Sequence, residues 1–302
     1  MKILTSAHIH ELDKYTIQHE PIKSIDLMER AAKAITEAIM RRWTTHTPIV
    51  TFAGPGNNGG DALAVSRMLA DQGYSVRVYL FNITGKLSDD CSTNRQRIID
   101  DKRIKSFMEV TTKFDIPELD ATSLIIDGLF GSGVNKPLAG GFAALVKYIN
   151  QCPAKVVSID MPSGLMTEDN SYNVRANIIR ADYTLTLHSK KLSMYLADCQ
   201  EYLGKVQVLD IRLSQEYMRD VDATYSILEE KDIRPRLLPR NDFAHKGSMG
   251  NALIIAGSYG MSGAAILSAR ACLRAGAGKV TVHTPRKNYD IMQTSVPEAV
   301  LH

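Results

Sequence analysis

The sequence lacks the features that mark membrane proteins and nucleic-acid-binding proteins. No apolar run approaches the roughly 18 residues of a membrane span, and the start MKILTSAHIHELD has no apolar signal core. The 302 residues carry 36 Lys and Arg against 33 Asp and Glu, a net charge of +3. Because the two signs are interspersed, the chain offers no basic field to a phosphate backbone. We therefore expect a cytoplasmic protein without membrane or nucleic-acid partners.

The sequence is also poor in familiar metal and phosphate motifs. Cys91, Cys152, Cys199 and Cys272 are far apart and form no C-x-x-C pair. We expect these cysteines to be reduced and structural. No Cys/His spacing predicts a zinc site. The glycine-rich stretch FAGPGNNGGDALAV is not followed by G-K-S or G-K-T, which excludes a P-loop.

Strand-like and helix-like segments alternate over most of the chain. The first long helix, 24–39, carries a buried stripe at three-four spacing, and IVTFA (49–53) is apolar on both faces of a strand. This alternation predicts a Rossmann-like α/β fold, a mainly parallel sheet with helices on both faces. Further strands are expected at 75–81, 123–128, 155–160, 183–189 and 205–213, and further helices near 61–72, 89–100 and 142–151.

The segment 214–247 differs from what precedes it, since it holds two prolines, mixed charges and little apolar periodicity. We predict a first domain at 1–215, a junction at 216–247 and the start of a second α/β domain at 248–302. The second domain contains one recognisable β-α-β unit between NALIIAGS and KVTVHTP. Its core would be small, so we expect either part of a larger domain or a shortened one that leans on the first.

Three predicted strands end in loops of unusual composition: GPGNNGGD (54–61), DGLFGSGVNKP (127–137) and DMPSG (160–164). Ligands of open parallel sheets bind beyond the carboxyl ends of the strands. Three such loops in register therefore predict one functional pocket.

The first loop holds G-x-G-x-x-G at Gly54, Gly56 and Gly59, which is typical of dinucleotide-binding dehydrogenases. The acid that should end the next strand is missing, because Asn82 stands there. An NAD(P)-dependent dehydrogenase is therefore the less favoured interpretation. Backbone N–H groups at a helix N-terminus can hold a phosphate without lysine.

Asp127 and Asp160 both end predicted strands in apolar surroundings. A buried carboxylate there suits cation binding or proton transfer, although capping of the following turn is a structural alternative. Ser163 has the same alternative, and Asn57 with Asn58 could simply stabilise a turn. The oxygen donors Asn58, Asp127 and Ser163 would suit a hard, weakly charged cation.

The motifs FAGPGNNGGDALAV, DGLFGSGVNKPL and SIDMPSGL, with the N-terminal TSAHIHELDKYTIQHEPIKSIDLMERAA, together resemble the NAD(P)H-hydrate epimerase domain over about residues 1–215. HKGSMGNALIIAGSYGMSGAAILSARACLRAGAGKVTVHTP resembles the start of a ribokinase-like, ADP-dependent NAD(P)H-hydrate dehydratase. The resemblance implies a repair enzyme that interconverts the R and S epimers of hydrated nicotinamide nucleotides, NADHX and NADPHX. It leaves the preference between these two substrates open.

The resemblance also implies roles for individual residues. Asp160 would contact the hydrate near its reacting ring and is our candidate for proton transfer, with Asp127 as the alternative. A potassium ion would be held by Asn58, Asp127 and Ser163. The remaining substrate-binding residues would be Asn57, Asn58, Gly59, Gly60 and Asp61, followed by Gly131, Ser132, Gly133, Val134, Asn135, Lys136 and Pro137.

The second domain departs from the family pattern. The ADP site and the catalytic aspartate of the dehydratase follow a glycine-rich motif downstream of the residues present here. We therefore expect no dehydratase activity from these 302 residues. A nucleotide-binding module without catalysis is a further alternative. The apolar stripes of the N-terminal helices fit either a homodimer or a monomer that buries them.

Overall fold

The computed structural model describes residues 1–101, 103–115, 117–237 and 239–302. These residues form two compact units, Met1–Leu228 and Glu229–His302. The domain limits predicted at 215 and 248 stay predictions, and residue 238 of the predicted junction lies outside the described residues. No helix in the described part of the chain is long and apolar enough to span a bilayer.

The first unit is built on a seven-stranded sheet whose neighbouring strands all pair in parallel. Its order is β4-β3-β2-β5-β6-β7-β8, so the chain reverses direction across the sheet between β2 and β5. This confirms the predicted Rossmann-like fold. The strands are β2 (Ile49–Ala53), β3 (Val76–Phe81), β4 (Ser106–Val110), β5 (Leu124–Gly128), β6 (Lys155–Ile159), β7 (Tyr183–Leu187) and β8 (Lys205–Leu209).

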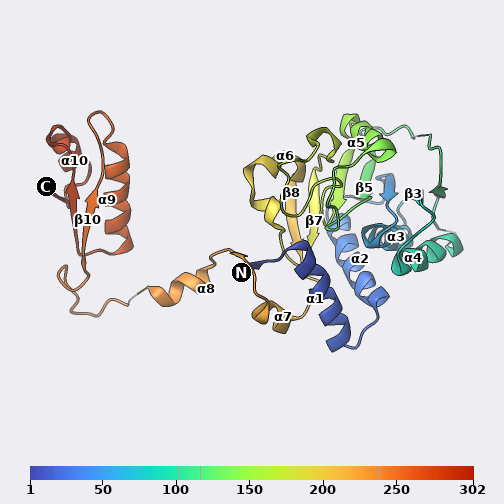
Figure 1. Cartoon of the computed structure of the whole chain (residues 1–302), viewed down its shortest axis with the longest axis horizontal. Coiled ribbons are helices and arrows are strands. Elements are labelled where there is room, and N and C mark those ends of the chain that lie inside the picture. Colours follow the sequence, from blue (N-terminus) through green and yellow to red (C-terminus); the bar gives the residue numbers. More distant parts are fainter. Residues whose placement is uncertain (102, 116, 238) are drawn as a thin grey trace. The chain divides into compact units, whose positions relative to one another are not determined.

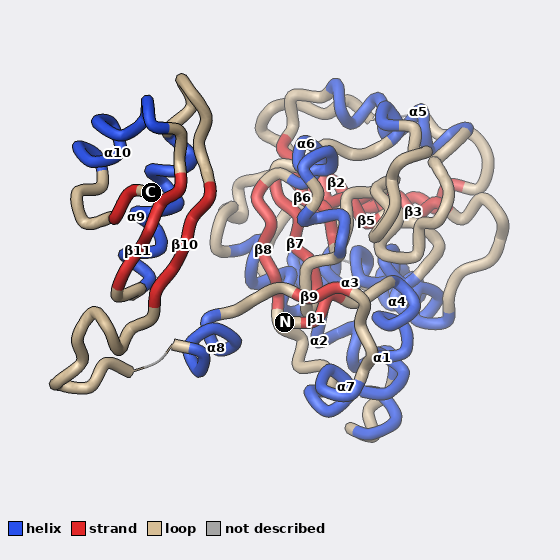
Figure 2. The backbone as a smooth tube through the Cα atoms, turned by 60° about the vertical axis from the view of Figure 1, so that its left-hand side comes forward, coloured by secondary structure: helices blue, strands red, loops and turns tan. Residues whose placement is uncertain are grey.

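The sheet lies between two layers of helices (Figures 1 and 2), and alternate residues of its inner strand β2 belong to two separate apolar clusters. In β2, Ile49 and Ala53 join one apolar cluster while Val50 and Phe52 join another. The first cluster includes residues of α2 (Ser24–Met40), α3 (Asn57–Asp71) and α4 (Asp89–Asp100). The second includes residues of α5 (Gly140–Gln151). Burial on both faces explains the continuous apolar strands in the sequence.

Edge strand β4 was not predicted. Its residues SFMEV alternate between exposed and partly buried side chains before the fully buried Val110, and they include a glutamate. A strand that pairs on one side and faces solvent on the other needs no long apolar run, so its sequence gives little signal.

The N-terminal segment returns to the end of the first unit. Strand β1 (Lys2–Ile3) pairs antiparallel with β9 (Tyr225–Ser226). Helix α1 (Ser6–His19) begins after Thr5, whose hydroxyl accepts a hydrogen bond from the His8 N–H at 3.3 Å. The apolar side of α1 packs with α2 and with residues that follow β8, so this helix is fixed beside the sheet. Short helices α6 (Gln200–Leu203), α7 (Gln215–Asp220) and, in the other unit, α8 (Glu230–Ile233) complete the connections.

The second unit holds a parallel sheet of β10 (Asn251–Ile255), β11 (Lys279–His283) and β12 (Val300–Leu301). Helix α9 (Gly263–Ala275) connects the first two strands, as the sequence predicts. Helix α10 (Tyr289–Ser295) and strand β12 were not predicted, because they are too short for a periodic pattern. A small cluster around Ala265, Val280, Val282 and Met292 forms the core of this unit.

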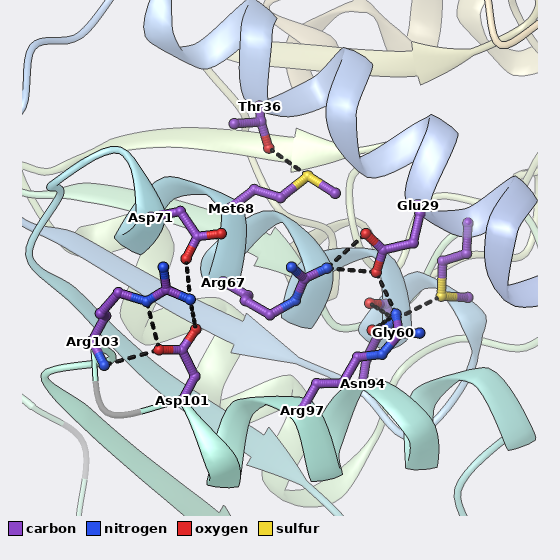
Figure 3. Close-up of polar contacts among 11 residues, drawn as sticks. Glu29, Thr36, Gly60, Arg67, Met68, Asp71, Asn94, Arg97, Asp101 and Arg103 are labelled. Atoms are coloured by element: carbon purple, nitrogen blue, oxygen red, sulfur yellow. Dashed lines mark hydrogen bonds and ion pairs between the residues drawn. The ribbon is translucent and has the colours of Figure 1, made fainter.

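Helices α2, α3 and α4 are also joined by charged groups. Glu29 accepts hydrogen bonds from Arg67 at 2.5 and 2.6 Å and from Arg97 at 2.6 Å (Figure 3). The side chains of Glu29 and Arg67 are only 26% and 19% exposed, so both charges are partly desolvated. One carboxylate therefore compensates two guanidinium groups at the junction of three helices.

We expect Glu29→Gln to destabilise the first unit by about 1–3 kcal/mol, because it leaves two partly buried guanidinium groups without a counter-charge. The melting temperature should fall by about 2–4 °C per kcal/mol. Trp43 is the only tryptophan of the chain and lies in this unit, so its fluorescence reports the transition. Glu37→Gln, which removes an exposed pair with Arg41 at 3.9 Å, is the control and should change the melting temperature little. Equal shifts in both variants would contradict the expectation.

Candidate functional site

A pocket of about 630 Å³ opens at the carboxyl ends of the parallel strands of the first unit. Loops after β2, β5, β6 and β7 line it, together with helices α1 and α2. It spans the reversal between β2 and β5, where open parallel sheets bind their ligands. The predicted loops 54–61 and 127–137 and the start of loop 160–164 all contribute.

Most of the residues predicted for the site lie on this pocket. The lining includes Asn57, Asn58, Asp61, the whole segment 131–137 and Asp160. Gly59 and Gly60 do not line it, and neither do Asp127 and Ser163, which are fully buried. The structure thus brings the three loops together, with Asp127 and Ser163 behind the pocket wall.

The glycine-rich loop is shaped by close backbone packing. Helix α3 begins at Asn57, four residues earlier than predicted, with Gly56 as its N-cap and no capping side chain. A Cβ on Gly54 would lie 1.8 Å from the Leu129 carbonyl oxygen, and one on Gly59 would lie 1.8 Å from the Gly54 carbonyl oxygen. Gly54 thus lets the loops after β2 and β5 touch, and Gly59 lets the start of α3 pack on the backbone of Gly54, beside the pocket lined by Asn57 and Asn58.

Asn58 carries an unsatisfied polar atom. Its Nδ2 is buried and has no hydrogen-bond partner in the described part of the chain. A Cβ on Gly131 would lie 3.1 Å from its Oδ1, so the amide lies against the loop that follows β5. A buried amide without a partner indicates a position where a ligand completes the hydrogen bonding.

Asp127 lies at the end of β5 and is completely buried. Its carboxylate accepts hydrogen bonds from the hydroxyl of Ser158 at 2.7 Å, from the Ser163 N–H at 2.9 Å, from the Ser163 hydroxyl at 2.5 Å and from the Leu129 N–H at 3.4 Å. Burial raises the pKa of Asp127, and the hydrogen bonds from Ser163 and Ser158 oppose that rise. Among the described residues no lysine or arginine pairs with this carboxylate.

Asp160 follows β6 in the left-handed conformation, with φ of 61°. This backbone is strained for a residue other than glycine and is typical of functional positions. Its Oδ1 accepts hydrogen bonds from the Leu187 N–H at 3.1 Å and from the Thr186 hydroxyl at 3.3 Å. The same oxygen forms an ion pair with the ammonium group of Lys191.

Two further carboxyl groups face this pair. Asp61 of α3 is buried, and desolvation with the charges of Asp160 and Asp13 raises its pKa well above the usual range. Desolvation and Asp160 raise the pKa of Asp13, on α1, to about 6, although Lys191 opposes the rise. The pocket therefore contains acids that differ in their readiness to hold a proton, as proton-transfer chemistry requires.

Sequence reasoning missed Asp13, His188 and Lys191. The stretch HSKK follows strand β7, so the rule that selected the other three loops would have included it. The stretch contains two lysines and no glycine, so its composition matched none of the motifs that marked the other loops. Asp13 lies on a helix that precedes the sheet, and only the packing of α1 brings it to the strand ends.

Comparisons with known proteins agree with this architecture. Residues 24–193 match the family described as YjeF-related protein N-terminus, and residues 252–302 match the family described as NAD(P)H-hydrate dehydratase. The chain is 33% identical to the NAD(P)H-hydrate epimerase of Limosilactobacillus fermentum over 207 residues, 68% of this chain and 95% of that protein. It is 32% identical to the bifunctional NAD(P)H-hydrate repair enzyme Nnr of Coxiella burnetii over 301 residues, 97% of this chain but 58% of that protein.

A solved structure is similar to most of the chain. The crystal structure of yeast ynu0, YNL200c, superposes with a TM-score of 0.57 at 20% identity, covering 77% of this chain and 98% of that one. At this level of identity the likeness concerns the fold.

We expect Asp13→Asn to stabilise the first unit at pH 7.5 by about 1–3 kcal/mol and to leave stability near pH 4 unchanged. The pKa of Asp13 is about 6 in the folded state against the usual 3.8, so the folded state binds more protons between these values. Stability must then fall as pH rises through this window, and the amide removes that loss. Urea unfolding followed by Trp43 fluorescence at the two pH values measures it. The exposed Asp222→Asn is the control, and a gain of equal size at pH 4 would contradict the assignment.

Proposed function

We propose that this chain, which belongs to the family of NAD(P)H-hydrate epimerases with a YjeF-related N-terminus, interconverts the R and S epimers of NADHX and NADPHX. The observation that carries the proposal is the convergence of Asn58, the loop 131–137 and the ion-paired Asp160 on one pocket. The proposal concerns the unit Met1–Leu228. The chain spans 58% of the Coxiella burnetii relative, which is named bifunctional, and we propose epimerisation alone for the part present here.

The dinucleotide would be held chiefly by neutral donors. The N-terminus of α3, from Asn57 to Asp61, offers N–H groups and amides, and segment 131–137 adds backbone donors and Lys136. Oriented N–H groups at a helix N-terminus stabilise phosphate without a dedicated lysine. Such a site would bind a diphosphate without the strong positive potential that a nucleic-acid-binding groove carries.

The reaction follows from the chemistry of the hydrate. Its C6 hydroxyl stands next to the ring nitrogen N1, whose lone pair forms a π bond to C6 as the protonated hydroxyl leaves as water. Water then adds to the other face of the iminium, and its surplus proton goes to a base. A positioned carboxylate assists such transfers by about 10²–10⁴-fold.

Asp160 is our candidate for the group that takes and returns this proton. It lines the pocket, and its Oδ2 makes no hydrogen bond within the described part of the chain. Asp127 is the weaker candidate, because it does not line the pocket and four hydrogen bonds occupy its oxygens. Asp61, whose raised pKa favours the protonated form, would donate to the departing hydroxyl, and the proton that Asp160 takes from the incoming water would return to Asp61 through solvent before the next turnover.

Asn58, Asp127 and Ser163 would hold a potassium ion. The fit is supported by the buried carboxylate of Asp127, which lacks a cationic partner among the described residues, and Asn58 would contribute its Oδ1, since its unpaired Nδ2 is a donor that suits an acceptor of the substrate instead. The Phe130 carbonyl, 3.1 Å from the Ser163 hydroxyl, adds a further oxygen. Oxygen donors with one carboxylate suit a hard monovalent cation. When bound, the ion would supply positive charge next to the substrate's phosphates.

We expect Asp160→Asn to lower kcat for epimerisation by about 10²–10⁴-fold, because the amide cannot take up the proton. Purified S epimer is incubated with the protein, and NMR follows the appearance of the R epimer beyond the spontaneous rate. Asp169→Asn, an exposed position in the same loop, should keep wild-type activity. Full activity in Asp160→Asn together with its loss in Asp127→Asn would reverse the two roles.

The same assay separates the alternatives. Stabilisation of the wild-type chain by the hydrate without turnover indicates a nucleotide-binding module. Oxidation or reduction of an alcohol or carbonyl substrate indicates a dehydrogenase. Either result would replace the epimerase proposal.

We expect KCl to raise the melting temperature of the first unit above its value in choline chloride of equal ionic strength. Binding only to the folded state stabilises it, by about 1–3 kcal/mol when the ion exceeds its Kd by roughly 10- to 100-fold. Trp43 fluorescence follows the melt. Asn58→Ala should lose the difference between the two salts, and a difference that survives in this variant would argue against the proposed ligands.

A further inference from the structure

Lys191 is a lysine in an unusual place. Its side chain is 2% exposed, and it follows β7 at the wall of the pocket. Lysine is almost never fully buried unless its charge is paired. The pairing partner is Asp160, the residue proposed above for proton transfer.

All three donors of the Lys191 ammonium group are used within the protein. One N–H donates to Asp160 Oδ1, one to the Thr186 hydroxyl at 2.8 Å and one to the Leu187 carbonyl at 3.1 Å. An ammonium group has three donors and no acceptor. Lys191 therefore has no N–H left for a substrate, which argues against its acting as the acid itself.

The two oxygens of Asp160 are consequently unequal. Oδ1 accepts from Lys191, from the Leu187 N–H and from the Thr186 hydroxyl. Oδ2 has no hydrogen-bond partner in the described residues. The carboxylate is fixed through one oxygen and keeps the other for a ligand.

We propose that Lys191 is a positioning residue that keeps Asp160 ionised and oriented, so that Asp160 enters the reaction as the proton acceptor. The inference rests on the proposed function and adds to it how the base is kept in its charged form. In this assignment the ionised Asp160 accepts a proton, and a protonated neighbouring acid donates one.

The surroundings explain why a buried ammonium group is needed. Asp13 faces the pair from α1 and Asp61 faces it from α3, and the charge of Asp160 contributes to the raised pKa of each. His188, next along from β7, has its pKa lowered by burial and by Lys191, which favours the neutral imidazole. Neither acid nor the neutral histidine supplies a positive charge to the Asp160 carboxylate. Lys191 is the cation in contact with it.

The test compares Lys191→Met with the control Lys190→Met. Lys190 does not line the pocket, and its Nζ lies 5.5 Å from the centroid of the Tyr195 ring. Initial rates of epimerisation are measured from pH 5 to pH 9 in both variants and in the wild type. We expect Lys191→Met to lower kcat by about 10-fold or more and to move the acid limb of the pH profile upward by about 1 unit or more. Lys190→Met should retain the wild-type profile.

Further variants keep the result decisive. Lys191→Arg, which retains the charge, should keep the acid limb near its wild-type position even if geometry lowers kcat. The same upward shift on adding Lys191→Met to His188→Asn would show that the imidazole is not the titrating group. Trp43 fluorescence checks that each variant is folded, and if Lys191→Met does not fold, Lys191→Arg against Lys191→Gln replaces it.

If folded Lys191→Met has the same acid limb of the pH profile as the wild type, the inference is wrong. The proposed function still stands in that case, provided that the wild-type chain epimerises. A wild-type chain that does not epimerise would overturn both.

Discussion

The buried carboxylate of Asp127 determines the geometry of the candidate site. It binds the hydroxyl of Ser158 within β6 and both the N–H and the hydroxyl of Ser163 beyond it. Asp160 lies between these two serines and has a left-handed backbone. Fixing both ends of a six-residue segment lets the strained residue in its middle persist, because the surrounding contacts over-determine its conformation.

A second constraint is the contact between the loops that follow β2 and β5. Gly54 lets its backbone approach Leu129 so closely that a Cβ would overlap the Leu129 carbonyl oxygen. Helix α3 begins at Asn57, directly after this contact. Its N-terminus, which includes Asn58, therefore lies against the segment after Gly128. Backbone packing thus joins the proposed phosphate-binding segments, whereas side-chain hydrogen bonds position the carboxylate.

The sequence predicted the first sheet and the three loops because both follow short-range rules. Buried parallel strands read as apolar runs, and loops at their carboxyl ends share one edge of the sheet. The sequence did not predict strand β4, helix α10 or strand β12. An edge position or a short length weakens the hydrophobic pattern on which such predictions depend. Asp13 and Lys191 escaped for another reason: their contribution depends on tertiary contacts that bring α1 and the end of β7 to Asp160. The roles assigned to individual site residues remain predictions.

The acidity of the pocket bears on the charge of its ligand. Asp13, Asp61, Asp90 and Asp160 all line a cavity proposed to take an anionic dinucleotide. Four ionised carboxylates in one pocket would repel a bound diphosphate. Lys191 compensates Asp160, and the raised pKa of Asp61 favours its neutral form. The burial that would make Asp61 a proton donor would therefore also lower the negative charge that the proposed substrate meets. The proposed acid–base chemistry and the proposed binding of an anion are therefore compatible, because both would follow from the same desolvation.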